Sequence, residues 1–303
     1  MFSRQTIHDA KWFGRSPHYF GRHILYLKKV WIPEPLQRQY TSLTALLLLL
    51  VVTTWTNCSA PKVASDSQPI SHASWDSLLR KHVDDQGLVN YQGMTADSSL
   101  LKEYLQLLAE NPPNNQSWSE AEQMAYWINA YNAFTIKLVV DHYPITGLKE
   151  IKNGVPFVNS VWDIKFFEIG GEAFDLNNIE HGILRKEYSD PRIHFALVCA
   201  SLSCPKLQRF AFTADRLEEQ LDQASREFVN DTFRNNIYEN PIQLSKILSW
   251  YWMDFRDTYD SRYDFIQQYA ESPIDTENDI KFLDYNWRLN EQSPKKRALL
   301  QGN

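Results

Sequence analysis

The stretch that decides the fold is SWSEAEQMAYWINAYNAFTIKLVV, residues 117–140. Its first four residues have the form of a capping box, in which the Ser117 hydroxyl accepts from the amide of Glu120 and the Glu120 carboxylate bonds back to the amide of Ser117. The helix predicted behind this cap is apolar on nearly every face, so we expect the rest of the domain to enclose it. Asn129 and Asn132 project from one side of this helix. Both must have specific partners, because an unpaired buried amide costs on the order of 1–3 kcal/mol.

Shorter elements are predicted on both sides of this helix. The helical period recurs in five further stretches, at residues 75–83, 100–108, 178–185, 213–229 and 245–255. Strands are predicted at residues 87–91, 193–199 and 280–287, and hairpins at residues 166–176 and 237–244. The stretch 193–199 is apolar on both faces, which predicts a central strand.

Helices and hairpins alternate, but not in the regular order of repeated βαβ units, and this favours the α+β class. No second linker interrupts residues 74–290. We therefore expect a single α+β domain over these residues, with the central buried helix packed on a small, mostly antiparallel sheet that includes hairpins.

Charge is distributed unevenly along the 303 residues. The whole chain carries −6, from 31 Lys and Arg against 37 Asp and Glu, and residues 1–40 carry +5, from seven Lys and Arg against two Asp and Glu. The remaining residues therefore carry −11. Binding of nucleic acid is disfavoured, because phosphate backbones need clustered basic residues. The composition, 43% hydrophobic and 14% aromatic, also excludes a disordered protein.

An apolar run at residues 43–55 follows the basic leader and ends just before Cys58. Its 13 residues fall short of the roughly 20 that span a bilayer as a helix. The positive flank, the short apolar core and the cysteine resemble a bacterial lipoprotein signal, in which Cys58 would be lipidated. A cleaved export signal, an uncleaved signal anchor and a buried helix are the alternatives.

The domain organisation expected from this reading has four parts. Residues 1–57 form the leader with its export signal or anchor, residues 58–73 a polar tether, residues 74–290 the globular domain, and residues 291–303 a polar tail. The lipid or signal anchor would hold the folded part at the membrane, on the non-cytoplasmic side of the cell envelope.

Several polar residues are unusual for a hydrophobic core, and they are concentrated between residues 129 and 204. One reading is nucleophilic catalysis, in which Cys204 supplies the thiol, His181 or His194 the base, and Glu180 or an asparagine the orienting group. Cys204 is preferred as the thiol because it lies in a serine-rich loop, whereas Cys199 ends an apolar stretch and is expected to pack as a small hydrophobic side chain.

Two other readings of the same cluster remain open. His181, His194, Cys199 and Cys204 could form a zinc set, although the odd spacing of His194 and Cys199 on a strand weighs against it, and we assign no metal. In the structural reading the two cysteines form a disulfide and the polar residues satisfy one another. The candidate binding residues are Asn129, Asn132, Arg185 and Ser203, where Arg185 forms a stripe with Asn177 and His181 on one helix.

Several short motifs together suggest a family. They are WINAYNA (127–133), IEHGILR (179–185), DPRIHFAL (190–197), CAS (199–201) with SCP (203–205), ILSWY (247–251) with DF (254–255), and YNWRLN (285–290). These motifs resemble the domain of unknown function 547 family over roughly residues 74–290. Asn286 and Arg288 depart from the Asp and Ser of the family pattern. The resemblance implies one domain, exported or lipid-anchored in bacteria, and supplies no reaction.

Two functions are expected from these observations. The first is an exported, lipid-anchored domain of the cell envelope that acts as a thiol- or histidine-dependent hydrolase without a cofactor. The second is a binding or interaction domain without catalysis, whose polar centre and two cysteines are structural.

Overall fold

The computed structural model describes residues 60–151 and 160–300. The expected leader and export signal (residues 1–57) and the expected lipidation site Cys58 lie outside the described residues. Among the described residues, no helix combines the length and the apolar character needed to span a bilayer.

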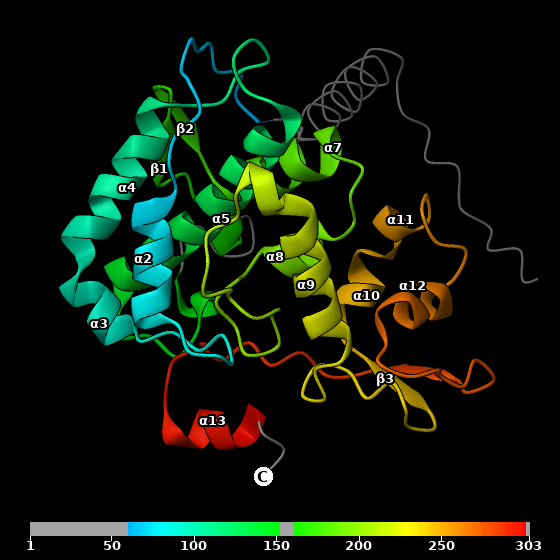
Figure 1. Ribbon diagram of the computed structural model, residues 1–303. Helices are drawn as coiled ribbons and strands as arrows, with labels where there is room; N and C mark the ends of the chain where they lie inside the picture. The colour runs from blue at the N-terminus through cyan, green and yellow to red at the C-terminus, as the bar shows by residue number, and fades with distance from the viewer. Residues whose placement is uncertain (1–59, 152–159, 301–303) are drawn as a thin grey trace, which may run out of the picture. The chain divides into compact units, whose positions relative to one another are not determined.

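The described chain is a mixture of helices, short helical turns and two pairs of strands, which confirms the α+β class (Figure 1). The α-helices are α2 (Ala73–His82), α3 (Tyr91–Ala96), α4 (Ser98–Glu110), α5 (Glu120–His142), α6 (Leu176–Ile179), α7 (Arg185–Glu187), α8 (Ile193–Ala196), α9 (Leu217–Val229), α10 (Ile247–Trp250), α11 (Trp252–Phe255), α12 (Arg262–Tyr269) and α13 (Pro294–Leu300). The 3₁₀-helical turns are η1 (Leu148–Glu150), η2 (Val161–Asp163) and η4 (Ala214–Arg216), and η3 (Glu180–Leu184) is a π-helical turn. The strands are β1 (Phe167–Ile169), β2 (Glu172–Phe174), β3 (Ile242–Leu244) and β4 (Ile280–Phe282).

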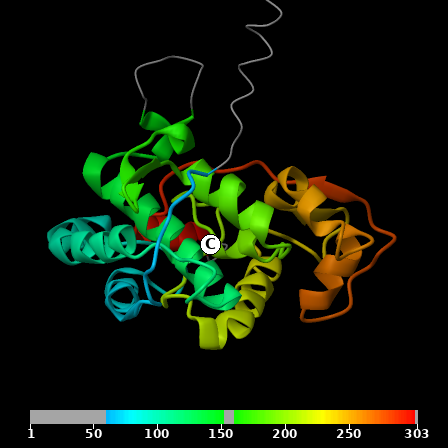
Figure 2. The same ribbon diagram turned by 90° about the horizontal axis from the view of Figure 1, so that it is seen from above.

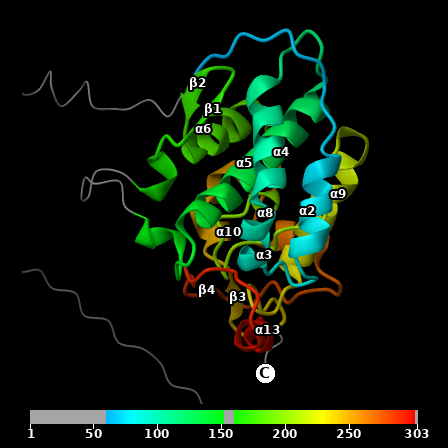
Figure 3. The same ribbon diagram turned by 90° about the vertical axis from the view of Figure 1, so that its left-hand side faces the viewer.

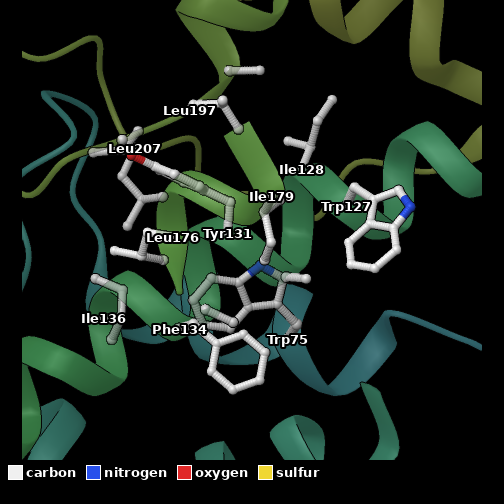
Figure 4. Close-up of a cluster of buried hydrophobic side chains, with 14 of the residues drawn as sticks. Trp75, Trp127, Ile128, Tyr131, Phe134, Ile136, Leu176, Ile179, Leu197 and Leu207 are labelled. Atoms are coloured by element: carbon white, nitrogen blue, oxygen red, sulfur yellow. The ribbon is translucent and has the colours of Figure 1, made fainter. Parts of the chain in front are cut away.

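Helix α5 is the predicted central helix, and it is buried over most of its length. Helices α2 to α4 lie on one side of it, and α9 to α12 lie on the other (Figures 1 and 2). Figure 4 shows its side chains Ile128, Tyr131 and Phe134 gathered with apolar residues from other segments, among them Leu176 and Leu197. The expectation of an enclosed helix is therefore confirmed.

The cap of α5 differs from the expectation by two residues. The capping box joins Ser119 and Glu122, and the helix begins at Glu120. Ser117 cannot cap the helix because its amide donates to the Asn114 side chain at 2.8 Å, inside the preceding turn. Both serines fit the capping pattern, so sequence alone did not distinguish them.

The strands form two separate pairs rather than one sheet, and Figures 1 and 3 show them at opposite ends of the described domain. Strands β1 and β2 form the predicted hairpin, in which Gly170 and Gly171 have φ of 59° and 81°. This hairpin packs on α5, where the rings of Phe134 and Phe167 stack 3.7 Å apart.

The second predicted hairpin, residues 237–244, is mostly replaced by a parallel pair. Strand β3 pairs in parallel with β4, and a single bridge between Asn236 and Gln243 remains of the hairpin. The predicted strand at residues 87–91 is likewise reduced to isolated bridges at Val89, because the Asn90 side chain accepts from the amide of Gly93 and starts α3.

The predicted central strand at residues 193–199 is wrong in type but right in burial. Residues 193–196 form the helical turn α8, and the chain becomes extended at Leu197. Ile193 and Ala196 belong to the apolar cluster around α5, whereas Phe195 belongs to a second cluster built from α9 to α12 and β3. A segment buried on all sides has no hydrophobic periodicity, so its sequence pattern does not distinguish a strand from a helical turn.

Residues 60–72, most of the expected tether, run as irregular chain against the domain. The Ser67 hydroxyl donates to the Pro112 carbonyl at 2.6 Å, and the Trp118 indole donates to the Ser67 carbonyl at 3.0 Å. At the other end, the expected polar tail contains the helix α13.

Candidate active site

A pocket of about 370 Å³ lies between α5, the turn η3, the loop after α8, and the segments around α10 and after β4. Its polar lining includes Glu180, His181, His194, Cys199 and Cys204, and its aromatic lining includes Tyr131, Trp162, Trp250, Tyr251, Tyr285 and Trp287. Four of the five polar residues come from the candidate catalytic set, so the structure brings that set into one cavity.

The turn η3 places Glu180 and His181 at the pocket. Asp175 caps the helix that leads into it, with a reciprocal bond to Asn178. Residues 180–184 then widen into a π-helical turn, a distortion that is frequent at functional sites. The wider turn changes the spacing of the predicted stripe, yet Arg185 still donates to Nδ1 of His181 at 2.7 Å.

Asp254 joins the two sides of this polar centre. It accepts from the Arg185 guanidinium at 2.5 and 2.8 Å, and its Oδ2 lies 2.7 Å from Nε2 of His194. Burial opposes ionisation of Asp254, but the hydrogen bonds from His194 and Arg185 outweigh it and hold the pKa of this carboxyl well below its usual range. Asp254 is therefore a carboxylate that orients both neighbours.

The two histidines have defined ring orientations. Since a guanidinium can only donate, Nδ1 of His181 accepts, and the proton of the neutral ring resides on Nε2. Burial lowers the pKa of His181 below its ordinary value. His194 directs Nε2 at the Asp254 carboxylate, its ring stacks 4.0 Å from that of Tyr251, and its Nδ1 has no hydrogen bond to any described residue. The lone pair at Nδ1 of His194 is thus available to accept a proton.

The two sulfur atoms lie 2.7 Å apart, and the Cys204 thiol donates to Cys199. The hydroxyl oxygens of Ser201 and Tyr285 lie 3.1 and 3.3 Å from the Cys199 sulfur. The hydrogen bond from Cys204 lowers the pKa of Cys199, against the effect of burial and with support from the two hydroxyls. Burial, followed by the neighbouring Cys199, raises the pKa of Cys204 well above its ordinary value.

The two thiols therefore have the opposite properties to those expected. Cys204 is buried, at 3% exposure, and acts as a donor, whereas Cys199 is half-buried and is the sulfur stabilised as a thiolate. No hydrogen bond among the described residues joins either sulfur to an imidazole.

The backbone around Cys199 is held in an unusual conformation. Ala200 has φ of 55°, a left-handed value that costs a non-glycine residue of the order of 1–2 kcal/mol. On the other side of Cys199, the side chain of Asn132 donates to the Ala196 carbonyl and accepts from the Val198 amide, both at 2.9 Å. Strained residues persist where surrounding contacts over-determine them, and they concentrate at active sites.

The expected binding residues mostly serve the framework. Asn129 makes a matched pair of bonds to the Phe212 backbone, at 2.7 and 3.0 Å, and is buried like Asn132. Ser203 accepts from the Asn286 amide at 2.8 Å, and Arg185 is engaged by Asp254 and His181. None of these four residues lines the pocket.

Sequence reasoning missed three residues of the site: Ser201, Asp254 and Tyr285. Asp254 is 60 positions from the histidine that it contacts, and Tyr285 is 86 positions from Cys199. The signal available for these three residues was their presence within the motifs CAS (199–201), DF (254–255) and YNWRLN (285–290). Among the described residues, no group of three or more His, Cys, Asp and Glu side chains is arranged to hold a metal ion.

Comparison with known proteins relates this site to a family. Residues 115–229 match the family described as Protein of unknown function, DUF547. Over these residues the chain is similar to the DUF547 family. No curated protein and no solved structure is detectably similar to the chain. The matched region contains Cys199, Cys204, His181 and His194, whereas Asp254 and Tyr285 lie beyond it.

Proposed function

We propose that this domain is a thiol-dependent hydrolase whose nucleophile is Cys199. The observation that carries this proposal is the surroundings of the Cys199 sulfur, which accepts from the Cys204 thiol, has the hydroxyl oxygens of Ser201 and Tyr285 within 3.3 Å, and lies on the wall of a pocket of about 370 Å³. A thiolate is the reactive form of cysteine, and such donors stabilise it near neutral pH.

The proposed reaction is acyl transfer through a thioester. The Cys199 thiolate attacks the carbonyl carbon of an ester or amide, a carbon–sulfur bond forms, and the bond to the leaving group breaks as that group takes up a proton. Water then cleaves the thioester, which releases the acid and returns the thiol. The hydroxyls of Ser201 and Tyr285 are within reach of the sulfur and are the candidate donors to the transient oxyanion.

His194 is the proposed general base and acid, and Asp254 is its orienting carboxylate. With Nε2 bound to Asp254, the ring presents Nδ1 for proton transfer, which follows the logic of a nucleophile, base and orienting group. Cys199 and His194 line the same pocket without a bond between them, and such catalytic contacts often tighten only in the substrate complex.

The nucleophile is tested by hydrolysis of p-nitrophenyl acetate. Cys199→Ala should abolish burst and turnover, and His194→Ala should reduce the rate by about 10²–10⁴-fold. Cys204→Ser, which keeps a hydroxyl donor to Cys199, is the matched control and should retain most of the activity. Unchanged hydrolysis by Cys199→Ala would refute the proposal.

The non-catalytic alternative is favoured by one observation, the 2.7 Å separation of the two sulfurs, which suits a pair that is readily oxidised to a structural disulfide. Under this alternative the purified protein would have no titratable thiol at Cys199 or Cys204 until it is reduced.

We further propose that the protein is exported and anchored by lipid at Cys58. The support is the basic leader, the short apolar run and the cysteine that follows it. Mass spectrometry of the membrane fraction should detect an acylated Cys58 at the mature N-terminus. A mature chain that still begins at Met1 would contradict this.

A further inference from the structure

Glu180 is a carboxylate at the pocket without a cationic partner among the described residues. Its side chain is 7% exposed, it lines the cavity, and none of the salt bridges of the described chain includes it. Tyr251 lines the same pocket, and burial, followed by the Glu180 charge, raises the pKa of this tyrosine. Burial of a polar side chain is costly unless a partner completes its interactions, so the pocket at Glu180 suits a ligand that can donate to it.

Arg185 makes no hydrogen bond to Glu180, because its guanidinium is engaged by other groups. Arg185 donates to Asp254 through both Nε and Nη2, at 2.5 and 2.8 Å, and it also donates to His181. No Lys or Arg is among the described residues that line the pocket. The pocket lining thus combines the buried Glu180 side chain with the Cys199 sulfur and, among the described residues, contains no Lys or Arg.

A cluster of aromatic rings also lines the pocket. Rings of Trp250, Tyr285 and Trp287 pack together with centroids 4.4 to 5.9 Å apart, and Trp162 lies against Trp287. The electron-rich faces of such rings attract ammonium groups. Trp287 already makes one contact of this kind, since the Lys149 ammonium lies 3.4 Å from its ring centroid.

We propose that this pocket binds a primary ammonium group of the substrate, with Glu180 as the counter-ion and the aromatic wall around Trp250 as its second contact. This deepens the proposed hydrolase and rests on it for the position of the reacting carbonyl. Glu180 and Cys199 line the same pocket, so the ammonium site and the sulfur share one cavity. The substrate class is therefore an acyl compound with a free amine near the carbonyl, such as an aminoacyl ester or a peptide with a free α-amine.

Binding of n-butylammonium, with 1-butanol as the neutral probe of similar size, tests the ammonium site by calorimetry. Glu180→Gln should weaken the affinity for n-butylammonium by about tenfold or more, because a charge-assisted bond is lost, and leave that for 1-butanol unchanged. Glu187→Gln is the matched control, since Glu187 is exposed on the same helical segment. Equal n-butylammonium affinity in the wild type and Glu180→Gln would overturn the inference.

Trp250→Ala keeps the test decisive if Glu180→Gln does not fold. Trp250 is 48% exposed, so its removal leaves the core intact, and the affinity for n-butylammonium should fall about fivefold. Met253→Ala, at 65% exposure and outside the pocket lining, is its control and should bind as the wild type. Unchanged affinity in Trp250→Ala would count against the aromatic contact.

Hydrolysis assays distinguish failure of the ammonium site from failure of the proposed hydrolase. The wild type should hydrolyse alanine p-nitrophenyl ester at least about tenfold faster, in kcat/KM, than its N-acetyl analogue, and Glu180→Gln should lose that preference. Cys199→Ala should lose hydrolysis and retain n-butylammonium binding. Binding that survives without hydrolysis in the wild type would refute the hydrolase alone, whereas hydrolysis without a preference for the free amine would refute the ammonium site alone.

Discussion

Nε2 of His194 lies 2.7 Å from Oδ2 of Asp254, across 60 positions of sequence. His194 lies on α8, whose neighbours Ile193 and Phe195 belong to different apolar clusters, and Asp254 lies on α11 in the second of them. The contact therefore forms where the two clusters meet, which is also where the pocket lies. A carboxylate at this junction holds the imidazole in one orientation toward the cavity.

Asp254→Asn should disable the site while the domain remains folded. The amide cannot accept from both His194 and Arg185 as the carboxylate does, so hydrolysis should fall by about 10²–10⁴-fold. The loss of stability should be modest, about 1–2 kcal/mol, because the Arg185 and Asp254 side chains are about a quarter exposed and solvent screens the pair. Asp257→Asn, on the exposed surface nearby, is the control in both assays. Full activity of Asp254→Asn would exclude the orienting role.

Asn132→Ala should damage both stability and the reactive loop. The substitution leaves the buried Ala196 carbonyl and Val198 amide without a hydrogen-bond partner. The free energy of unfolding, measured with denaturant, should fall by about 3 kcal/mol. Alkylation of Cys199 should also slow severalfold, because the loop that holds the sulfur among its donors is released. Asn129→Ala removes two equivalent bonds to the Phe212 backbone and should cost a similar amount without slowing alkylation. Equal alkylation rates in the two variants would show that Asn132 serves stability alone.

His72 should make the domain less stable in mild acid. Burial lowers its pKa to about 4, and Nδ1 lies 2.8 Å from the Tyr104 hydroxyl. The unfolded chain binds this proton near the ordinary value of about 6.5, so stability is complete above that pH and falls as pH drops toward 4. The free energy of unfolding should fall by about 3 kcal/mol, because the pKa of His72 is about 4 in the folded chain and about 6.5 in the unfolded chain.

Denaturant unfolding between about pH 7 and pH 4 measures this loss. His72→Gln should flatten the profile by about the same 3 kcal/mol. His142→Gln, at an exposed position near the end of α5, should follow the wild type. A wild-type profile that is flat over this range would contradict a neutral, buried His72.

The parts of the fold that sequence predicted well are those with strong local signals. The enclosed helix α5 and the hairpin turned by Gly170 and Gly171 both depend on residues close together in the chain. The type of residues 193–199 was not predictable, because a segment buried on all sides has no period. The parallel pairing of β3 and β4 joins residues nearly 40 apart, and no local rule encodes it.

The sequence predicted which residues form the candidate site better than it predicted what each residue does. Sequence identified the two cysteines, His181, His194 and Glu180, and the structure lines one pocket with them. The assignment of Cys204 as the accessible thiol failed because accessibility depends on the left-handed turn at Ala200 and on the long-range donor Tyr285. Asp254 could not be assigned a partner without the tertiary structure.

The central claim, that Cys199 is an activated thiol, is tested most directly by its rate of alkylation with iodoacetamide as a function of pH. Peptide mass spectrometry follows Cys199 and Cys204 separately in the folded, full-length protein. The account predicts that Cys199 is labelled first, with an apparent pKa below the ordinary value of about 8.5, and that Tyr285→Phe slows its labelling near neutral pH. Cys204 should be labelled only on unfolding. Labelling of Cys204 before Cys199, or no labelling of either until a reductant is added, would contradict the account.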